Sequence, residues 1–315
     1  MSLITAANAA QLALAMTARC GYITRAVWAN GGQALVVSHG SGLSIWLGGF
    51  DARPNHVFAA EAPMRAVAAS SLGPLAATAG HDGQIRLWNT ETWTRDQQMP
   101  VQLHRGAATA VGFHPSRWVI ASGDANGFAV QVDLKSGRFM KLLGHSKDIT
   151  RIAYSPDGKQ IATGSWDRTA RLFNATTGIH QHTLEHSAWV RWLAYSRDGA
   201  QVATACSDGV LRLWNSADGT LAHEVEAHPS GLDALDWSPD GSLLATGGRD
   251  GALRLWDAST LALLGVRENA HTKPVLTLAF RPQGDFLISG GGDNWLHLWE
   301  IPAEDPPAQG DSSQD

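Results

Sequence analysis

Cysteine is scarce in this chain, and the shortage excludes two common ways of stabilising a fold. The 315 residues include 2 cysteines, Cys20 and Cys206, which lie far apart and form no Cys-x-x-Cys pair. A disulfide framework needs several cysteines, and a structural zinc site needs ligands at close spacing. We therefore expect two reduced, partly buried thiols, no metal site and no cofactor.

Long apolar runs are also missing. No segment reaches the roughly 18 apolar residues that a membrane helix needs. A short apolar stretch lies within the opening segment MSLITAANAAQLALAMTARC, but no basic residue precedes it, which argues against a secretory signal. These absences predict a soluble, cytoplasmic protein that has no membrane partner.

Charge is low and nearly balanced. Charged residues make up 17% of the chain, the formal net charge is −5, and no run of Lys and Arg is present. A nucleic-acid partner would need a local basic patch, so we expect none. The 44% of hydrophobic residues and the 33 glycines can form a core and many turns, which favours an all-β fold.

The chain repeats itself. The nonapeptides SDGVLRLWN, at 207–215, and RDGALRLWD, at 249–257, are nearly the same, and the aromatic position in them recurs at intervals of 41 to 44 residues. Self-similarity of this period is typical of arrays of small structural units. Seven copies of the position are filled by Trp46, Trp88, Val132, Phe173, Trp214, Trp256 and Trp299.

Three further positions keep constant offsets from that aromatic. An Asp or Asn stands six residues before it in all copies but the first, where Gly40 replaces it, and a Thr or Ser stands ten residues before it in the same six copies. A His stands 28 residues before it in the last five copies, at His104, His145, His186, His228 and His271. Each unit also contains short β-rich segments separated by Asp-Gly and similar turns, which predicts a small antiparallel meander of about four strands.

This pattern resembles the WD-repeat family of β-propellers over roughly residues 10 to 301. The pair Gly144-His145, the pair Trp256-Asp257 and the repeated Asp-Gly turns carry the resemblance. It implies an all-β fold, a seven-bladed propeller of four-stranded antiparallel sheets. The first three units depart from the family pattern, since Ala60 replaces the His in the second and Val132 replaces the Trp in the third.

The recurring His, Ser or Thr, and Asp are also the side chains of a hydrolase triad. The resemblance implies a structural role instead, a hydrogen-bonded tetrad inside each blade that satisfies buried polar groups. Several complete copies of an active site in one chain would be implausible. A metal ring is excluded because adjacent sheets lie about 10 Å apart, whereas metal ligands lie within about 2.6 Å of their ion. The complete tetrads are His186, Thr204, Asp208 and Trp214; His228, Thr246, Asp250 and Trp256; and His271, Ser289, Asp293 and Trp299.

The two ends of the propeller are expected to meet. Several prolines follow Trp299, so a fourth strand of the seventh blade is not expected there. Residues about 10–17, which include the strand-compatible QLALAMT, would supply that strand and remove an exposed edge. We therefore predict one propeller over residues 1–301 and a disordered acidic tail over 302–315.

The resemblance further implies a non-enzymatic scaffold or adaptor that binds other proteins or peptides on its loop face, as a monomer or as a subunit of a larger complex. Trp166 and Trp189 fill no repeat position and stand in polar loops, and exposed Trp is enriched in binding hot spots. The alternative is a packing role, in which both residues cover a blade junction. The alternative function is an enzyme or a small-ligand site in the axial funnel. It would require a cluster of unpaired carboxylates, His or Cys that breaks the repeat register, and the sequence shows no such cluster. The candidate partner-binding residues are Trp166, Trp189, Arg249, Asp148, Tyr22 and Trp295.

Overall fold

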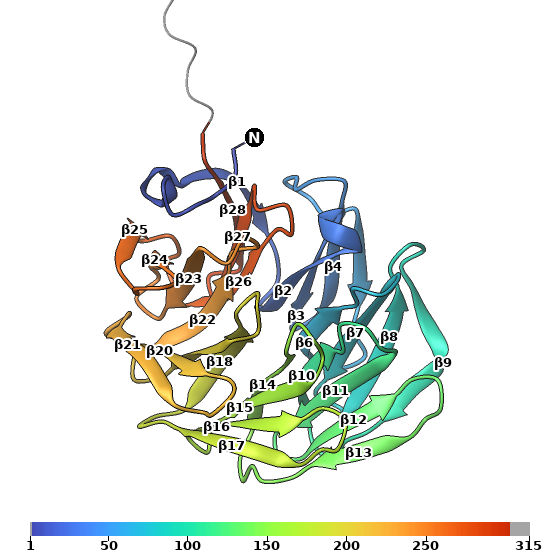
Figure 1. Ribbon diagram of the computed structural model, residues 1–315. Coiled ribbons are helices and arrows are strands. Elements are labelled where there is room, and N and C mark those ends of the chain that lie inside the picture. Colours follow the sequence, from blue (N-terminus) through green and yellow to red (C-terminus); the bar gives the residue numbers. More distant parts are fainter. Residues whose placement is uncertain (1, 303–315) are drawn as a thin grey trace, which may run out of the picture.

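The β-rich segments of each repeat form hairpins whose turns depend on glycine. In the fifth unit, for example, Gly199 and Gly209 follow aspartates in tight turns and adopt φ values of 75° and 83°, a region that side chains other than glycine rarely occupy. The computed structural model describes residues 2–302, except for the side chains of 96–101. Within this part of the chain, seven four-stranded antiparallel sheets surround a common axis (Figure 1).

Each sheet is one blade, and its strands follow the chain from the axis outward in all blades but the last. The strands of blade 1 are β2 (Ile23–Ala29), β3 (Ala34–His39), β4 (Gly42–Leu47) and β5 (His56–Ala59), and those of blade 2 are β6 (Met64–Ala69), β7 (Leu75–Gly80), β8 (Gln84–Asn89) and β9 (Thr94–Gln102). Blades 3 and 4 contain β10 (Ala108–Phe113), β11 (Val119–Asp124), β12 (Ala129–Asp133) and β13 (Phe139–Leu142), then β14 (Ile149–Tyr154), β15 (Gln160–Ser165), β16 (Thr169–Asn174) and β17 (His180–Glu185). Blades 5 and 6 contain β18 (Val190–Tyr195), β19 (Gln201–Cys206), β20 (Val210–Asn215) and β21 (Leu221–Glu226), then β22 (Leu232–Trp237), β23 (Leu243–Gly248), β24 (Leu253–Asp257) and β25 (Leu263–Arg267). Blade 7 is formed by β26 (Val275–Phe280), β27 (Leu287–Gly291), β28 (Trp295–Glu300) and the first strand of the chain, β1 (Ala13–Arg19).

The ring is continuous at its centre. Each innermost strand contacts the innermost strands of the two neighbouring blades, and β26 contacts β2. Two short 3-10 helices, η1 (Ala9–Gln11) and η2 (Asn30–Gly32), are the only helical elements within residues 2–302. The predicted fold class, an all-β propeller with seven blades, is therefore confirmed.

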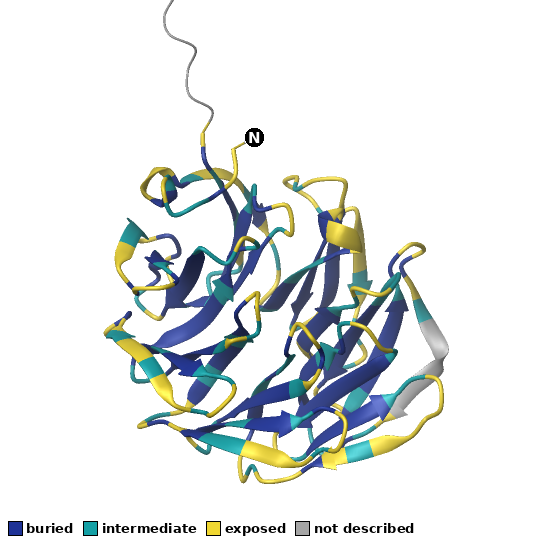
Figure 2. Cartoon of the chain, viewed as in Figure 1, coloured by how far each residue is buried: buried dark blue, intermediate teal, exposed yellow. Residues whose placement is uncertain are grey.

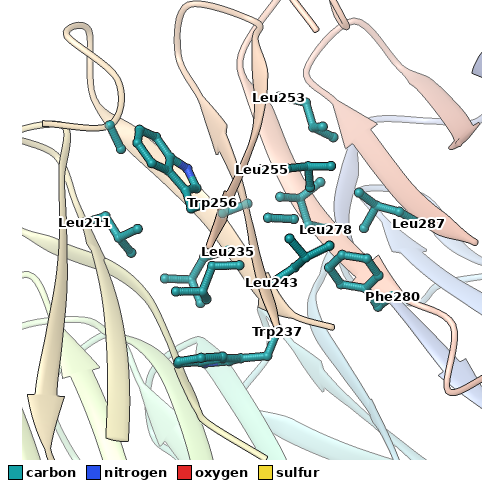
Figure 3. Close-up of a cluster of buried hydrophobic side chains, with 14 of the residues drawn as sticks. Leu211, Leu235, Trp237, Leu243, Leu253, Leu255, Trp256, Leu278, Phe280 and Leu287 are labelled. Atoms are coloured by element: carbon teal, nitrogen blue, oxygen red, sulfur yellow. The ribbon is translucent and has the colours of Figure 1, made fainter. Parts of the chain in front are cut away.

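The core lies between blades, because each sheet is buried by the sheets on either side of it. The inner three strands of most blades are largely buried, whereas the described residues of the outermost strands are mostly exposed or half-buried (Figure 2). Between blades 6 and 7, Leu235, Leu243 and Leu255 pack with Leu278 and Phe280 (Figure 3). Each such leucine contributes on the order of 2 kcal/mol when it leaves water. Stacking thus supplies the stability that a lone four-stranded sheet lacks.

The two ends of the chain close the ring, as predicted. β1 pairs antiparallel with β28, from Ala13 opposite Glu300 to Arg19 opposite Trp295. The strand begins later than residue 10, because η1 comes first. The guanidinium of Arg267, on β25, donates to the carbonyl of Ala10 at 2.8 Å, so the segment before β1 is also tied to blade 6.

Beyond β28, Ile301 forms an isolated bridge with Ser2. The tail that we predicted over 302–315 lies outside the described residues from position 303 onward. Along residues 2–302, no helix has the length and apolar character to cross a membrane.

Candidate functional site

The repeated polar residues bond to one another inside the blades. In blade 6, His228 Nδ1 donates to Asp250 Oδ1 at 2.9 Å, and Thr246 Oγ1 lies 2.9 Å from His228 Nε2. Trp256 Nε1 donates to the same hydroxyl oxygen at 2.8 Å. Burial lowers the pKa of His228, which favours the neutral ring that this arrangement needs. Arg254 also donates to Asp250 Oδ2 at 2.7 Å, so the polar atoms of the tetrad are engaged by its own members and by this arginine, which leaves no free nucleophile or base.

Blade 7 repeats this geometry with Ser289 in place of the threonine. His271 lies 3.1 Å from Asp293 Oδ1 and 2.8 Å from the hydroxyl of Ser289, to which Trp299 Nε1 donates at 2.9 Å.

Blade 5 differs, and the prediction of a complete tetrad there is wrong. His186 Nδ1 donates to the carbonyl of Leu184 at 2.9 Å and does not bond Asp208. The carboxylate of Asp208 instead accepts from the guanidinium of Arg212 at 2.9 Å and from the hydroxyl of Ser187. Thr204 still accepts from Trp214 and contacts His186. Asp250 of blade 6 also accepts from an arginine four residues later and keeps its histidine, so the donor that distinguishes blade 5 from blade 6 is the hydroxyl of Ser187, while His186 bonds the backbone carbonyl two residues before it.

Blade 3 has a carboxylate that the repeat pattern misses. Asn126 occupies the usual Asp position, but Asp124, two residues earlier, lies 3.4 Å from Nδ1 of His104 and accepts from the backbone N–H of Asn126 and Phe128. The side chain of Asp124 is buried. Through these two backbone bonds it caps its own turn, as the repeated Asp does in other blades.

A β-bulge stands at the second residue of every innermost strand. At each of these seven positions the register with the next strand shifts by one residue. Bulges re-aim side chains and are common beside functional sites. The bulged residues are Thr24, Arg65, Thr109, Thr150, Arg191, Asp233 and Leu276.

All seven bulged residues line one pocket, which we call the funnel. Because each blade contributes one of them, the funnel lies on the axis of the ring. Its volume is about 200 Å³, and Tyr22, Asp148, Trp166 and Trp192 complete most of its wall. The innermost strands begin at this face, which is therefore the face that carries the loops between units.

Trp166 and Trp189 form a stacked pair at the rim of the funnel. Their ring centroids are 5.3 Å apart and their planes are inclined by 23°. Trp166 follows β15 and Trp189 directly precedes β18, so the pair bridges blades 4 and 5. Trp189 remains 44% exposed, and the guanidinium of Arg191 lies 5.9 Å from the Trp166 ring. The pair both covers a blade junction and presents an indole to solvent.

Charged side chains of the funnel are arranged around one buried carboxylate. Asp233 accepts from Arg191 at 2.8 Å and from Arg249 at 3.1 Å, and its side chain is 4% exposed. Asp148 is also buried, and burial raises the pKa of its carboxyl. Its Oδ1 atom has no hydrogen-bond partner among the described residues. Because this oxygen is closed off from solvent, the carboxyl of Asp148 is part of the funnel wall.

The structure brings together most of the residues that the sequence singled out. Tyr22, Asp148 and Trp166 line the funnel, Trp189 stacks on Trp166, and Arg249 is joined to the funnel through Asp233. Trp295 is the exception. It begins β28 opposite Arg19 of β1, on the outer side of blade 7, and does not line the funnel.

Sequence reasoning missed the bulged residues, including Arg65 and Arg191. They stand 23 residues before the repeat's aromatic position in six units and 22 before it in the first. The signal that could have found them is a position whose side chain varies between units and that directly follows a position that is apolar in every unit. The sequence showed no cluster of unpaired carboxylates, His or Cys, and the charged groups that line the funnel include Asp148 and an Asp233 that is paired with Arg191.

Comparison with protein families identifies the family of this chain. The family WD domain, G-beta repeat matches residues 52–89, 137–174, 178–215, 219–257 and 264–300, which together exceed half of the chain. The protein therefore belongs to this family. The unmatched units are the first and the third, where Gly40 and Val132 replace the usual Asp and Trp. A comparison with curated proteins found no match.

Proposed function

We propose that this protein is a non-enzymatic scaffold or adaptor that binds a protein or peptide on the face carrying the funnel. The single observation that supports this most is the stacked pair of Trp166 and Trp189. The exposed indole of Trp189 is a large apolar surface held rigidly by a partner ring, and rigid exposed aromatics are typical of binding hot spots. Propellers of this family commonly serve as such platforms.

Charged groups around the pair would orient the partner. Tyr22, at the start of blade 1, is 59% exposed and lines the funnel, as does Asp148 at the start of blade 4. Arg249 donates to Asp233, which lines the funnel. Apolar contact on Trp189 together with polar contacts toward Asp148 and Arg249 would select an amphipathic peptide segment. Trp295 remains a weaker candidate for the same partner, since it is 40% exposed but lies away from the funnel.

A small ligand in the funnel is the second candidate function. The convergence of Asp148, Asp233 and Arg191 favours it. The volume of about 200 Å³ is below the roughly 300 Å³ at which ligand pockets usually begin, so the surface role is preferred.

The proposal includes a cytoplasmic location and no nucleic-acid partner. Both cysteines are free, and burial raises the pKa of Cys206 to about 12, which keeps that thiol protonated and unreactive. A net charge of −5 gives no general attraction to phosphate backbones.

Affinity purification with matched variants tests the proposal. Trp189→Ala removes the exposed indole, and Trp118→Ala, in the turn between β10 and β11 on the opposite face, is the control. Partners captured by the native protein and by Trp118→Ala should be lost with Trp189→Ala. Equal capture by all three proteins would remove this face from consideration.

A further inference from the structure

A layer of side chains closes the axial channel beneath the funnel. It is formed at the residue that follows each bulge, where Arg25, Arg151 and Trp192 are the large members. The guanidinium carbon of Arg25 lies 4.9 Å from the centroid of the Trp192 ring, and that of Arg151 lies 4.3 Å from it. Arg25 belongs to blade 1 and Trp192 to blade 5, which are not neighbours in the ring. Arg25 must therefore reach across the axis.

Hydrogen-bond donors in this layer lack acceptors. Arg25 Nε, Arg151 Nη1 and Trp192 Nε1 are all buried and have no partner among residues 2–302. Arg25 is 6% exposed and Trp192 is 7% exposed, so neither side chain is compensated by bulk water. An unpaired buried donor costs about 1–3 kcal/mol, and more when it is charged. Three such donors in one layer point to a missing acceptor.

The layer also carries uncompensated positive charge. In the part of the chain that the structure describes, neither Arg25 nor Arg151 forms an ion pair with a carboxylate. Asp236, further along β22, acts on Arg151 only at a distance, and its Oδ2 accepts from the backbone N–H of Phe280 at 2.8 Å. Burial lowers the pKa of Arg151 to about 9 and raises that of Asp236 to about 6, as expected for charges that are poorly paired.

We propose that the axial channel contains an anion-binding site formed by Arg25, Arg151 and Trp192. Its occupant is a small free anion, an inorganic oxyanion or a carboxylate of similar size, because two guanidinium groups and an indole N–H provide only donors. Of the three residues, only Trp192 lines the funnel, so the site lies under the funnel floor and a bound partner chain would not fill it. The proposal is independent of the partner-binding role.

The anion would add to the contact that Arg25 and Trp192 already make across the axis of the ring. Arg25 comes from β2, whereas Arg151 and Trp192 come from β14 and β18 on the far side of the axis. An acceptor that is hydrogen-bonded by all three side chains would connect blade 1 to blades 4 and 5. Occupancy should therefore stabilise the folded ring by mass action.

Thermal unfolding in a chloride-free buffer of low ionic strength tests the site. Sodium phosphate, sodium acetate and sodium chloride are added separately at matched ionic strength to the native protein, Arg25→Met, Arg151→Met and Arg138→Met. Arg138 is exposed and is the control for the loss of one positive charge. The native protein and Arg138→Met should gain a few degrees in a saturating manner with at least one anion. The two channel variants should show only the linear effect of salt on any protein.

A second expectation distinguishes an anion site from a structural arginine. Without added anion, Arg25→Met should be as stable as the native protein or more stable, because the substitution removes an uncompensated charge. Calorimetric titration of the native protein with sodium phosphate gives an independent measurement, and heat that saturates at one site per chain is expected. Two outcomes would overturn the proposal. One is that calorimetric titrations with phosphate, acetate and chloride all lack a saturable signal, and the other is the same linear salt response in all four proteins. Either would mean that water alone solvates the three donors.

Discussion

The indole of Trp166 stacks on that of Trp189 at a centroid distance of 5.3 Å, although the two residues belong to different blades. The Arg191 guanidinium lies 5.9 Å from the Trp166 ring, whereas Trp189 is 44% exposed. The more exposed indole of the pair is therefore that of Trp189. Trp189 thus differs from the core tryptophans of the repeat, which are buried on all sides.

Replacing Trp189 with alanine should cost little stability. An aromatic pair is worth about 0.5–1.5 kcal/mol beyond the area that it buries, and Trp189 is 44% exposed, so Trp189→Ala should lower the free energy of unfolding by less than the loss of a core tryptophan does. Trp256→Ala, by contrast, removes a side chain that is 4% exposed together with its bond to Thr246, and should cost about 3–5 kcal/mol. Urea unfolding of both variants measures the difference. Equal losses would mean that Trp189 is a core residue.

Much of the fold could be predicted from the sequence because most of the repeated residues have the same structural role from unit to unit. The aromatic of the third strand and the Asp-Gly turn recur in register, and each marks the same place in its blade. Closure by the first strand followed from the prolines after Trp299, which left blade 7 without an outer strand.

The candidate site was harder to predict because it depends on how equivalent positions meet around the axis. A repeat alignment places Arg151 and Trp192 at equivalent positions of their units, and Arg25 one residue away from that position. It does not show that Arg25 crosses the channel to reach Trp192. The same limit applies to Asp208, whose choice between His186 and Arg212 depends on local geometry and not on spacing.

Stability should fall in mild acid. Burial lowers the pKa of His186 to about 4, so in the folded protein this ring stays neutral until well below its usual titration range. Below about pH 6.5 the unfolded chain binds a proton that the folded chain rejects, and stability therefore decreases as the pH falls from about 6.5 toward 4. His186 alone should contribute a loss of about 2 kcal/mol between pH 7.5 and pH 5.

Urea unfolding at several pH values checks this slope. His186→Gln should reduce it, whereas His56→Gln, which changes an exposed histidine on β5, should leave it unchanged. The buried rings of His228 and His271, whose pKa values burial also lowers, act in the same direction and preserve part of the slope in the variant. A slope that is the same in all three proteins would contradict the assignment to His186.

Asp233→Asn should destabilise the funnel. The aspartate is the only carboxylate that bonds Arg191 and Arg249 within residues 2–302, and its loss leaves two guanidinium groups facing each other. Because both arginines are partly exposed, the expected cost is about 1–2 kcal/mol, below that of a fully buried pair. Asp157→Asn is the matched control, since its partner Lys159 is 84% exposed and the pair should be worth less than about 0.5 kcal/mol. Chemical unfolding at low and high salt measures both, and a loss for Asp157→Asn as large as that for Asp233→Asn would refute the argument.

The closing strand should be essential for a soluble ring. Deleting residues 1–17 removes most of β1 and leaves the N–H and C=O groups of β28 unpaired along one edge, which is a template for intermolecular pairing. We expect a much lower unfolding temperature and aggregation on size-exclusion chromatography.

A pair of point substitutions on β1 isolates the same effect without shortening the chain. Ala18 is 1% exposed, lies opposite Leu296 and packs in the seam between blades 7 and 1, so Ala18→Asp places an unpaired carboxylate in an apolar cluster. The cost should be at least about 3 kcal/mol. Ala15 is exposed on the same strand, and Ala15→Asp should change the unfolding free energy by less than about 0.5 kcal/mol. Since both variants add one negative charge to one strand, a difference in their melting temperatures reports burial in the seam, and equal melting temperatures would show that β1 does not close the ring in solution.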